Sequence, residues 1–478
     1  MSAAIKQVKS EGYPEFLERK SQLGSYDGFD AVWMPGFLFD FQRALVEWAL
    51  QKGKSAIFAD CGLGKTPMQL VWAENVVRKT NGRVLILTPL AVGRQTLGEA
   101  EKFSIEAHRS TDGSLRPGIN IANYERLHYF SPEDFQGVVC DESSILKHFS
   151  GATQKSVTRF MSKMRYRLLC TATAAPNDYI ELGTSSEALG ELSNSEMLTK
   201  FFSQSERKPC RIEDVKQARK NRFAKLSFRV SQSIEQWHLK PYAETHFWRW
   251  VCSWARACRQ PSDLGFADDG FILPELIEKG HTVKALTLAP GLLFERPAIG
   301  LHEEREERRR TIQERCDYVA KLVDHTAPSV VWCHLNDEGD RLEKAIAGAR
   351  QIKGSTSDEE REELYEAFSS GQLRKLVIKP KIGAWGLNWQ HCSHVVSFAA
   401  HSYEQYYQAV RRCWRFGQQH PVTVDIVSTE GEAGIRENMK RKADAAVRMF
   451  ANLVTHMNDS MIVRREVNKQ KTELPTWL

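Results

Sequence analysis

The segment that decides the fold reads Asp60-Cys61-Gly62-Leu63-Gly64-Lys65-Thr66. It follows an apolar run, 56–59, that we interpret as a buried strand, and it precedes apolar residues at helical spacing. A strand, a glycine turn, Lys-Thr and a helix together predict a phosphate-binding loop. The glycines let backbone N–H groups turn toward an anion, and the helix N-terminus adds positive partial charge. We expect Lys65 to reach the β- and γ-phosphates and the Thr66 hydroxyl to bind Mg²⁺; a chance glycine turn before a core helix is the alternative.

The composition is that of an ordinary globular protein with more than one domain. The 478 residues suffice for two or three domains, and 42% are apolar and 26% charged. The ten cysteines form no CxxC pair, which predicts reduced, mostly buried thiols in a cytosolic protein. No signal peptide and no apolar run of membrane-spanning length is found, so we expect no membrane contact. Five clustered residues fit strand-end packing better than a metal site: Cys333, His334, His391, Cys392 and His394.

After the loop, short apolar strands alternate with helical stretches. The predicted strands are 84–88, 119–124, 138–141 and 167–171. Such alternation predicts a parallel sheet with helices on both faces, and ligands at the carboxyl ends of its strands. A second block begins near 329, with predicted strands 330–333, 350–353, 376–378, 394–398 and 422–427. It has no glycine-lysine loop of its own, which favours a nucleotide held between two lobes.

Two carboxylates end the strand 138–141, 76 residues after Lys65. At a strand tip facing the phosphate loop, Asp141 would hold Mg²⁺ and Glu142 would orient the attacking water. A strand ending in a polar turn is the alternative. Upstream, Gln42 is placed to read an adenine edge, although taken alone a surface glutamine on an N-terminal helix is the better explanation.

Two arginines in the second block, Arg412 and Arg415, lie at i and i+3. On a helix these positions share a face. The planar, always cationic guanidinium suits the γ-phosphate, so we expect both to act as arginine fingers across the lobe interface. An exposed basic helix explains the pair equally well when it is taken alone.

Between the two blocks, the stretch 207–229 holds nine basic and two acidic residues, a local charge of +7 against +6 for the whole chain. Arg219, Arg222 and Lys225 at its centre are candidates for nucleic-acid phosphate contacts, and a solvated helix face is the equal alternative. Further on, four aromatic residues on an expected helix are better explained as packing than as base-stacking platforms: Phe247, Trp248, Trp250 and Trp254.

Several motifs occur in one order along about 40–430, among them DCGLGKT, INIANYERL, DESSILKHFSGATQKS, RYRLLCTATAAPNDYIEL, KGSTSDEEREELYEAF, KIGAWGLNWQHCSHVVSF and QAVRRCWRFGQQHPVTV. In this order they resemble the superfamily 2 helicase-like ATPases, most closely the Swi/Snf-like branch in the lean form carried by bacteria and phages. The resemblance implies two tandem RecA-like α/β lobes with an inserted helical region. The implied boundaries are a lead-in at 1–36, lobe 1 at 37–184, a helical insertion at 185–310, lobe 2 at 311–433 and a helical brace at 434–478.

The resemblance also implies roles for residues that match its motifs. The loop from Cys61 to Thr66 would bind the phosphates of ATP, with Mg²⁺ on Thr66 and Asp141, and Gln42 would contact adenine. The remaining nucleotide positions would be Gly386, Asn388, Gln408, Arg412 and Arg415. Thr171 and Thr173 would couple nucleotide state to DNA. The family's Ser-Thr is Lys379-Pro380 here, so Lys379 or Lys381 would take over its nucleic-acid contact.

The resulting functional hypothesis is an ATP-hydrolysing DNA translocase that tracks along duplex DNA, with ATP and Mg²⁺ as cofactors. It would work in the cytoplasm of a bacterium or a phage-infected cell. Two alternatives stay open. One is a strand-separating DNA or RNA helicase, and the other is a nucleotide-switched DNA-binding module that recruits a nuclease or a replication or recombination factor.

Overall fold

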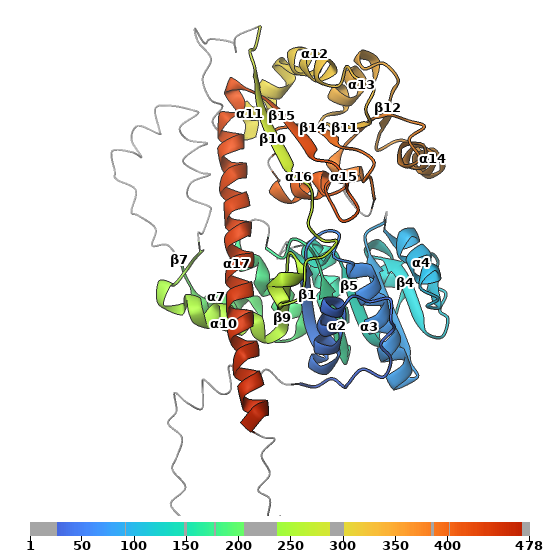
Figure 1. Cartoon of the computed structure of the whole chain (residues 1–478), viewed down its shortest axis with the longest axis vertical. Coiled ribbons are helices and arrows are strands. Elements are labelled where there is room, and N and C mark those ends of the chain that lie inside the picture. The colour runs from blue at the N-terminus through green and yellow to red at the C-terminus, as the bar shows by residue number, and fades with distance from the viewer. Residues whose placement is uncertain are drawn as a thin grey trace, which may run out of the picture.

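The computed structural model describes residues 26–90, 92–147, 151–175, 178–204, 237–286, 301–383, 387–400 and 402–470. These form two α/β lobes, one above the other, with one long helix running beside both (Figure 1). The first lobe lies below and carries the blue and green elements, and the second lies above in yellow and orange.

The first lobe is built on a seven-stranded sheet in the order β3-β4-β2-β5-β6-β1-β9, and all its strand pairs are parallel. Its strands are β1 (Lys54–Ala59), β2 (Arg83–Thr88), β3 (Ala107–Arg109), β4 (Ile119–Asn123), β5 (Phe135–Asp141), β6 (Tyr166–Cys170) and β9 (Ala255–Cys258). Successive residues of a strand enter opposite cores, because strand side chains alternate between faces. Ile57 packs in one core and Phe58 in the other.

Helices cover both faces of this sheet. On the face of Ile57 pack α2 (Asp40–Lys52), α3 (Lys65–Thr80) and α4 (Gly93–Lys102). On the face of Phe58 pack α5 (Ala152–Met161), α6 (Leu182–Leu189), α7 (Asn194–Phe201) and α10 (Glu244–Trp254). The four aromatic residues from Phe247 to Trp254 are buried in this second core, which confirms that they serve packing.

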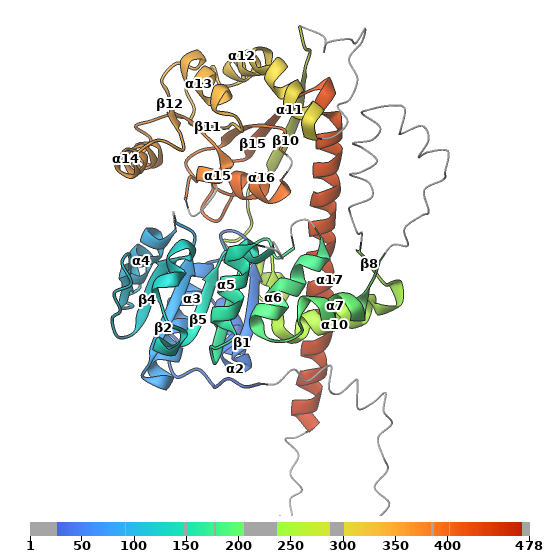
Figure 2. The ribbon, with the colours of Figure 1, turned by 180° about the vertical axis from the view of Figure 1, so that it is seen from behind.

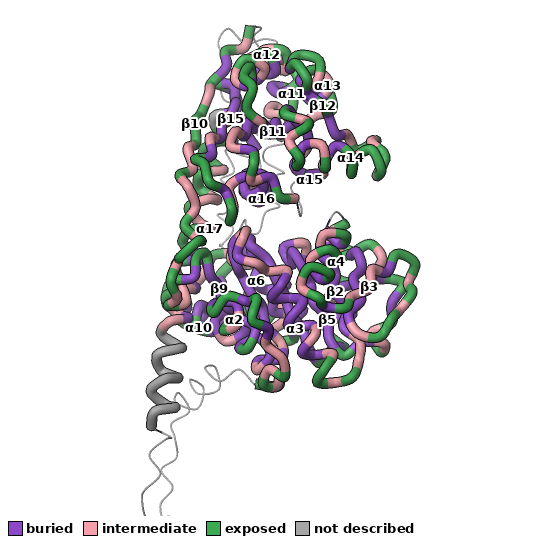
Figure 3. Tube along the Cα trace, turned by 45° about the vertical axis from the view of Figure 1, so that its right-hand side comes forward, coloured by how far each residue is buried: buried purple, intermediate pink, exposed green. Residues whose placement is uncertain are grey.

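The second lobe repeats the plan with a six-stranded parallel sheet in the order β10-β15-β14-β11-β13-β12. Its strands are β10 (Leu276–Val283), β11 (Ser329–Trp332), β12 (Ala349–Ile352), β13 (Lys375–Ile378), β14 (His394–Phe398) and β15 (Val422–Thr429). Its helices are α11 (Leu301–Arg310), α12 (Ile312–Leu322), α13 (Asn336–Ala345), α14 (Asp358–Ser369), α15 (Pro380–Gly383) and α16 (Tyr403–Val410). In both lobes buried residues gather toward the sheets and exposed ones on the outer faces (Figure 3).

The predicted fold of two parallel-sheet lobes is confirmed, and every predicted strand is present with its ends shifted by a few residues. The segment 185–310 differs from the expected helical insertion, because it supplies an edge strand to each sheet. β9 pairs with β1, and β10 pairs with β15 over eight residues. A short antiparallel pair, β7 (Phe202–Gln204) with β8 (Trp237–Leu239), also lies within it.

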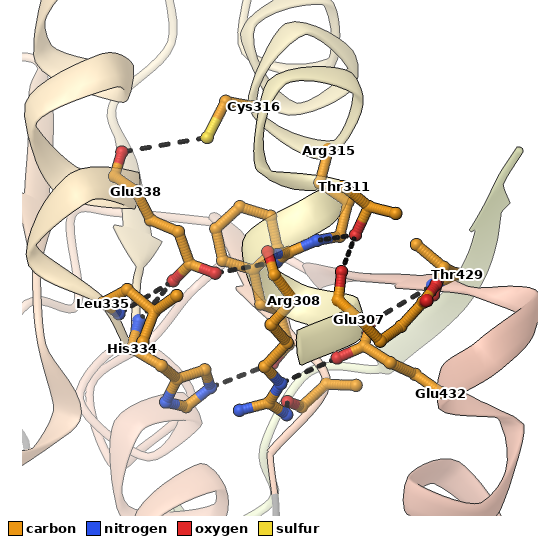
Figure 4. Close-up of polar contacts among 12 residues, drawn as sticks. Glu307, Arg308, Thr311, Arg315, Cys316, His334, Leu335, Glu338, Thr429 and Glu432 are labelled. Atoms are coloured by element: carbon orange, nitrogen blue, oxygen red, sulfur yellow. Dashed lines mark hydrogen bonds and ion pairs between the residues drawn. The ribbon is translucent and has the colours of Figure 1, made fainter. Parts of the chain in front are cut away.

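The long helix α17 (Ala433–Gln470) runs along both lobes, as seen from either side in Figures 1 and 2. Its N-terminal end, which we call its root, follows Glu432 and is held in the second lobe by buried charges (Figure 4). Arg308 donates to Glu432, which is fully buried directly before the helix, at 2.7 Å, and Thr429 donates to Glu307 at 2.7 Å. Nearby, Arg315 donates to Glu338 at 2.8 Å, and both side chains are fully buried.

Further along, α17 buries Met449, Phe450, Leu453 and Met457 in the first lobe's core, beside α10. The helix therefore bridges the lobes, as a brace would. Across the described residues, no helix combines the length and apolar character needed to span a membrane.

Candidate functional site

The phosphate loop lies between the end of β1 and the start of α3. Gly62 and Gly64 have φ of +90° and +73°, a left-handed conformation that side chains disfavour, so the turn requires glycine there. Lys65 is the first residue of α3, and its Nζ donates to the carbonyl oxygens of Ala59 at 3.0 Å and Asp60 at 3.3 Å. Thr66 follows, half-buried in the first helical turn. The loop thus places a cation and a hydroxyl at a helix N-terminus, as the sequence predicts.

Gln42 braces this loop from α2. It is 4% exposed, so it is not a surface glutamine. Its Nε2 donates to the carbonyl of Leu63 at 2.9 Å, and its Oε1 accepts the Phe39 N–H at 3.0 Å. A Cβ on Gly64 would meet Gln42 Nε2 at 2.3 Å, which is a second reason for glycine at that position. The contact of Gln42 with adenine stays a prediction.

The two carboxylates lie at the carboxyl end of β5, facing the loop. Gln69 on α3 donates to Asp141 Oδ1 at 2.7 Å. Burial, followed by the neighbouring Glu142 charge, raises the pKa of Asp141 from 3.8 to about 6. Glu142 has φ of +50°, and its Oε2 accepts from Thr171 Oγ1 at 3.3 Å and from Gln408 Nε2 of the second lobe at 3.4 Å. Glu142 is therefore oriented from both lobes.

A chain of hydrogen bonds continues from Glu142 into the second lobe. The Thr173 N–H donates to Thr171 Oγ1 at 3.0 Å, and Thr173 Oγ1 donates to Glu404 Oε1 on α16 at 3.5 Å. Lys147 of the first lobe pairs with the other oxygen of Glu404. Thr171 and Thr173 thus lie between the carboxylates and the second lobe, where a coupling role would place them.

The expectation that Arg412 and Arg415 share a helix face is wrong. Helix α16 ends at Val410, and both arginines lie in the turns that follow. The carbonyl of Arg412 accepts the Trp389 N–H at 2.8 Å, in place of a hydrogen bond within a helix. The two guanidinium groups nevertheless converge, because both donate to the carbonyl of Leu387, at 3.1 and 3.3 Å. Arg415 also donates to Asn388 Oδ1.

Within the described part of the chain, neither arginine forms an ion pair with a carboxylate, and the buried Nε of Arg415 has no hydrogen-bond partner. Burial lowers the pKa of Arg412, and burial together with the Arg412 charge lowers that of Arg415 to about 10. Arg412 is buried and Arg415 is half-buried, and holding two such cations together without an ion-pair partner is costly unless an anion binds between the lobes. With Lys65, Thr66 and Asp141 across the interface, the residues fit a magnesium-bound triphosphate.

One face of α16, continued by Arg411 directly after it, makes polar contacts with the first lobe. Glu404, Tyr407, Gln408 and Arg411 follow the i, i+3, i+4, i+7 spacing of a helix face, and each bonds to the first lobe. Sequence reasoning missed Tyr407 and Arg411. Their spacing was visible, but their partner, Asp60, precedes the loop's glycines and had no assigned role.

Other predicted residues lie apart from this cluster or outside the described residues. Arg219, Arg222, Lys225 and Gly386 fall outside them. Lys381 is exposed on α15, and Lys379 donates to Asn336. Cys333 and Cys392 are buried in the second lobe's cores, in keeping with packing.

Comparison with known proteins supports the motif reading of the second lobe. Residues 314–417 match the helicase conserved C-terminal domain family, which confirms the predicted helicase-like resemblance there. Among solved structures, the chain is similar to the Sulfolobus solfataricus SWI2/SNF2 ATPase core in complex with dsDNA, at 15% identity and a TM-score of 0.37. The alignment covers 84% of this chain and 90% of that one, a likeness too distant to support a functional conclusion. No curated protein matches the chain.

Proposed function

We propose that this chain is an ATP-hydrolysing motor of the helicase type that moves along duplex DNA. The observation that carries the proposal is the arrangement at the lobe interface. Lys65 and the Asp141–Glu142 pair come from the first lobe. Arg412 and Arg415, which form no ion pair with a carboxylate among the described residues, come from the second. Together they supply the groups that a phosphoryl transfer to water needs.

In this mechanism each residue acts by position and charge. Lys65 and the N–H groups of the loop would hold the phosphates, and Glu142, oriented by Thr171 and Gln408, would orient the attacking water. Arg412 and Arg415 would stabilise the negative charge that spreads over the transferred group. Bound Mg²⁺, on Thr66 and Asp141, would supply further charge neutralisation.

Movement along DNA would follow from closure and opening of the interface. The hydrogen bonds from Glu142 through Thr171 and Thr173 to Glu404 link the hydrolysis site to α16. A motor that tracks a duplex grips its phosphate backbone, since phosphate contacts position a protein without reading sequence. Lys381 and the basic stretch 207–229 are the proposed handles.

The decisive experiment is steady-state ATP hydrolysis by the purified protein, alone and with duplex DNA, single-stranded DNA or RNA. Stimulation chiefly by duplex DNA, lost in Lys65→Ala, is expected. Stimulation chiefly by single strands would favour a strand-separating helicase. Absence of hydrolysis in folded protein under every condition would refute the motor.

The DNA handle is tested separately by charge reversal at Arg219, Arg222 and Lys225. Each lost phosphate contact should weaken duplex binding and reduce the slope of log K against log salt by about 0.9. An unchanged affinity and slope would show that this stretch is a solvated surface.

A further inference from the structure

Arg411 makes a buried ion pair between the two lobes. It is 6% exposed, and its Nη2 forms an ion pair with Asp60 Oδ2, directly before the glycines of the phosphate loop. The other oxygen of Asp60 accepts the Tyr407 hydroxyl and, at 2.6 Å, the Cys61 N–H. Asp60 is itself 3% exposed, so one buried carboxylate joins the loop backbone to Tyr407 of α16 and to Arg411 directly after it.

Arg411 is also fixed within its own lobe. Its guanidinium carbon lies 4.3 Å from the centre of the Trp414 ring, and Trp414 Nε1 donates to the carbonyl of Pro274 at 2.6 Å. Pro274 belongs to the segment between β9 and β10, which connects the lobes. Burial alone would lower the pKa of Arg411, but the charge of Asp60 and the contact with Tyr407 outweigh it and raise that pKa.

The three arginines of this turn have different environments. Arg411 has a carboxylate partner, whereas Arg412 and Arg415 have none among the described residues. The turn also touches the loop directly, because a Cβ built on Gly62 would lie 2.8 Å from the Phe416 backbone nitrogen. The turn from 411 to 416 therefore contacts the phosphate loop at both ends. Arg412 and Arg415, the two arginines without a carboxylate partner among the described residues, lie between these contacts.

We propose that Arg411, paired with Asp60, is a positioning residue that seats this turn on the phosphate loop and so aims Arg412 and Arg415 at the phosphates. The proposal rests on the proposed function. A buried ion pair adds little net stability over an apolar pair of equal size, but it fixes geometry, because the planar guanidinium bonds in defined directions. Arg411 orients the other two arginines and does not itself touch the nucleotide.

The test uses Arg411→Lys, which keeps the charge but loses the guanidinium fork, and Asp60→Asn, which keeps an acceptor for the Cys61 N–H. Displacing catalytic groups by about 1 Å can cost about 100-fold in rate. We therefore expect each variant to lower kcat by about 10- to 100-fold with less than about a threefold change in ATP affinity. The double variant should be no slower than the slower single one, because the two residues act as a unit.

A merely structural role is excluded by measuring single-turnover hydrolysis in an Arg415→Ala background. If Arg411 acts through the arginines of its turn, Arg411→Lys should cost much less there than in the wild type. The matched control is Arg315→Lys, which alters a second buried arginine–carboxylate pair, with Glu338 in the second lobe, far from the phosphate loop in sequence. Any cost of this control should be the same with and without Arg415.

The outcomes separate this proposal from the function on which it rests. Equal cost of Arg411→Lys in both backgrounds, or unchanged kcat in an active protein, would overturn the positioning role and leave the proposed function standing. A folded wild type without ATP hydrolysis would overturn both. Loss of ATP affinity instead of kcat would also overturn the positioning role, because it would place Arg411 in nucleotide binding.

Discussion

Replacing Gly62 by alanine should act as a wedge between the lobes. The new Cβ would lie 2.8 Å from the Phe416 nitrogen and 3.1 Å from its Cβ. Non-bonded carbons prefer roughly 3.5–4.0 Å, so Phe416 has to retreat by about 0.7 Å. Because Arg415 is the preceding residue, it retreats too. A displacement approaching 1 Å predicts a loss of about 10- to 100-fold in kcat, or about 1.4–2.7 kcal/mol of transition-state stabilisation.

The same alanine also strains the backbone, since Gly62 has φ of +90°. That strain costs about 1–2 kcal/mol and does not depend on the second lobe. Gly118→Ala is the matched control, because Gly118 has φ of +83° and nothing within 4 Å of the added Cβ. Both variants should lose similar stability in urea unfolding, but only Gly62→Ala should lose kcat while retaining ATP binding. Equal kcat in the two variants would refute the wedge.

Three further predictions concern charges. Glu142→Gln should retain ATP binding and lower turnover by about 10²- to 10⁴-fold, measured in a steady-state assay; unchanged turnover would remove Glu142 from the mechanism. Because the pKa of Asp141 is raised from 3.8 to about 6, the folded protein holds a proton that the unfolded chain releases, so its contribution to stability falls between about pH 4 and 6. Urea unfolding of Asp141→Asn across that range should lack this fall, and identical profiles would contradict the raised pKa. Arg315→Met should destabilise the fold by about 3–5 kcal/mol, because it leaves the buried charge of Glu338 unpaired. Adding Glu338→Gln, which removes that charge but keeps an acceptor for the His334 and Leu335 N–H groups, should restore part of it; a double variant no more stable than the single one would count against this account.

The sequence predicted the fold well where a pattern is local. Strands such as β1 and β11 are short runs between helical stretches, and burial on both sheet faces makes all but their first residues apolar. The edge strand β10 was missed for the opposite reason. β10 reads LIEKGHTV, with charged and exposed residues, because one side of an edge strand lacks a partner. Its position is set by pairing with β15, which comes much later in the chain.

The candidate site was predicted to a similar extent. The phosphate loop is one unbroken stretch of sequence, and so is the Asp141–Glu142 pair. In the structure each lies at the carboxyl end of its strand, as predicted. The conformation around Arg412 could not be predicted, because its carbonyl accepts a hydrogen bond from the Trp389 N–H, over 20 residues away in the chain. Likewise, the partner of Arg411 is Asp60, in the other lobe. Contacts between distant segments leave no local periodicity.

The helix α17 has a mechanical consequence. It is fixed to the second lobe at Glu432 and packs on the first lobe from Met449 to Met457. At 1.5 Å of rise per residue, Phe450 lies roughly 25 Å from the root, so a lobe rotation of about 10° would swing it by about 4 Å. That is close to the 5.4 Å helical pitch with which the side-chain ridges repeat. The helix would therefore have to slip by about one ridge over α10 or bend, which would divide lobe movement into discrete steps.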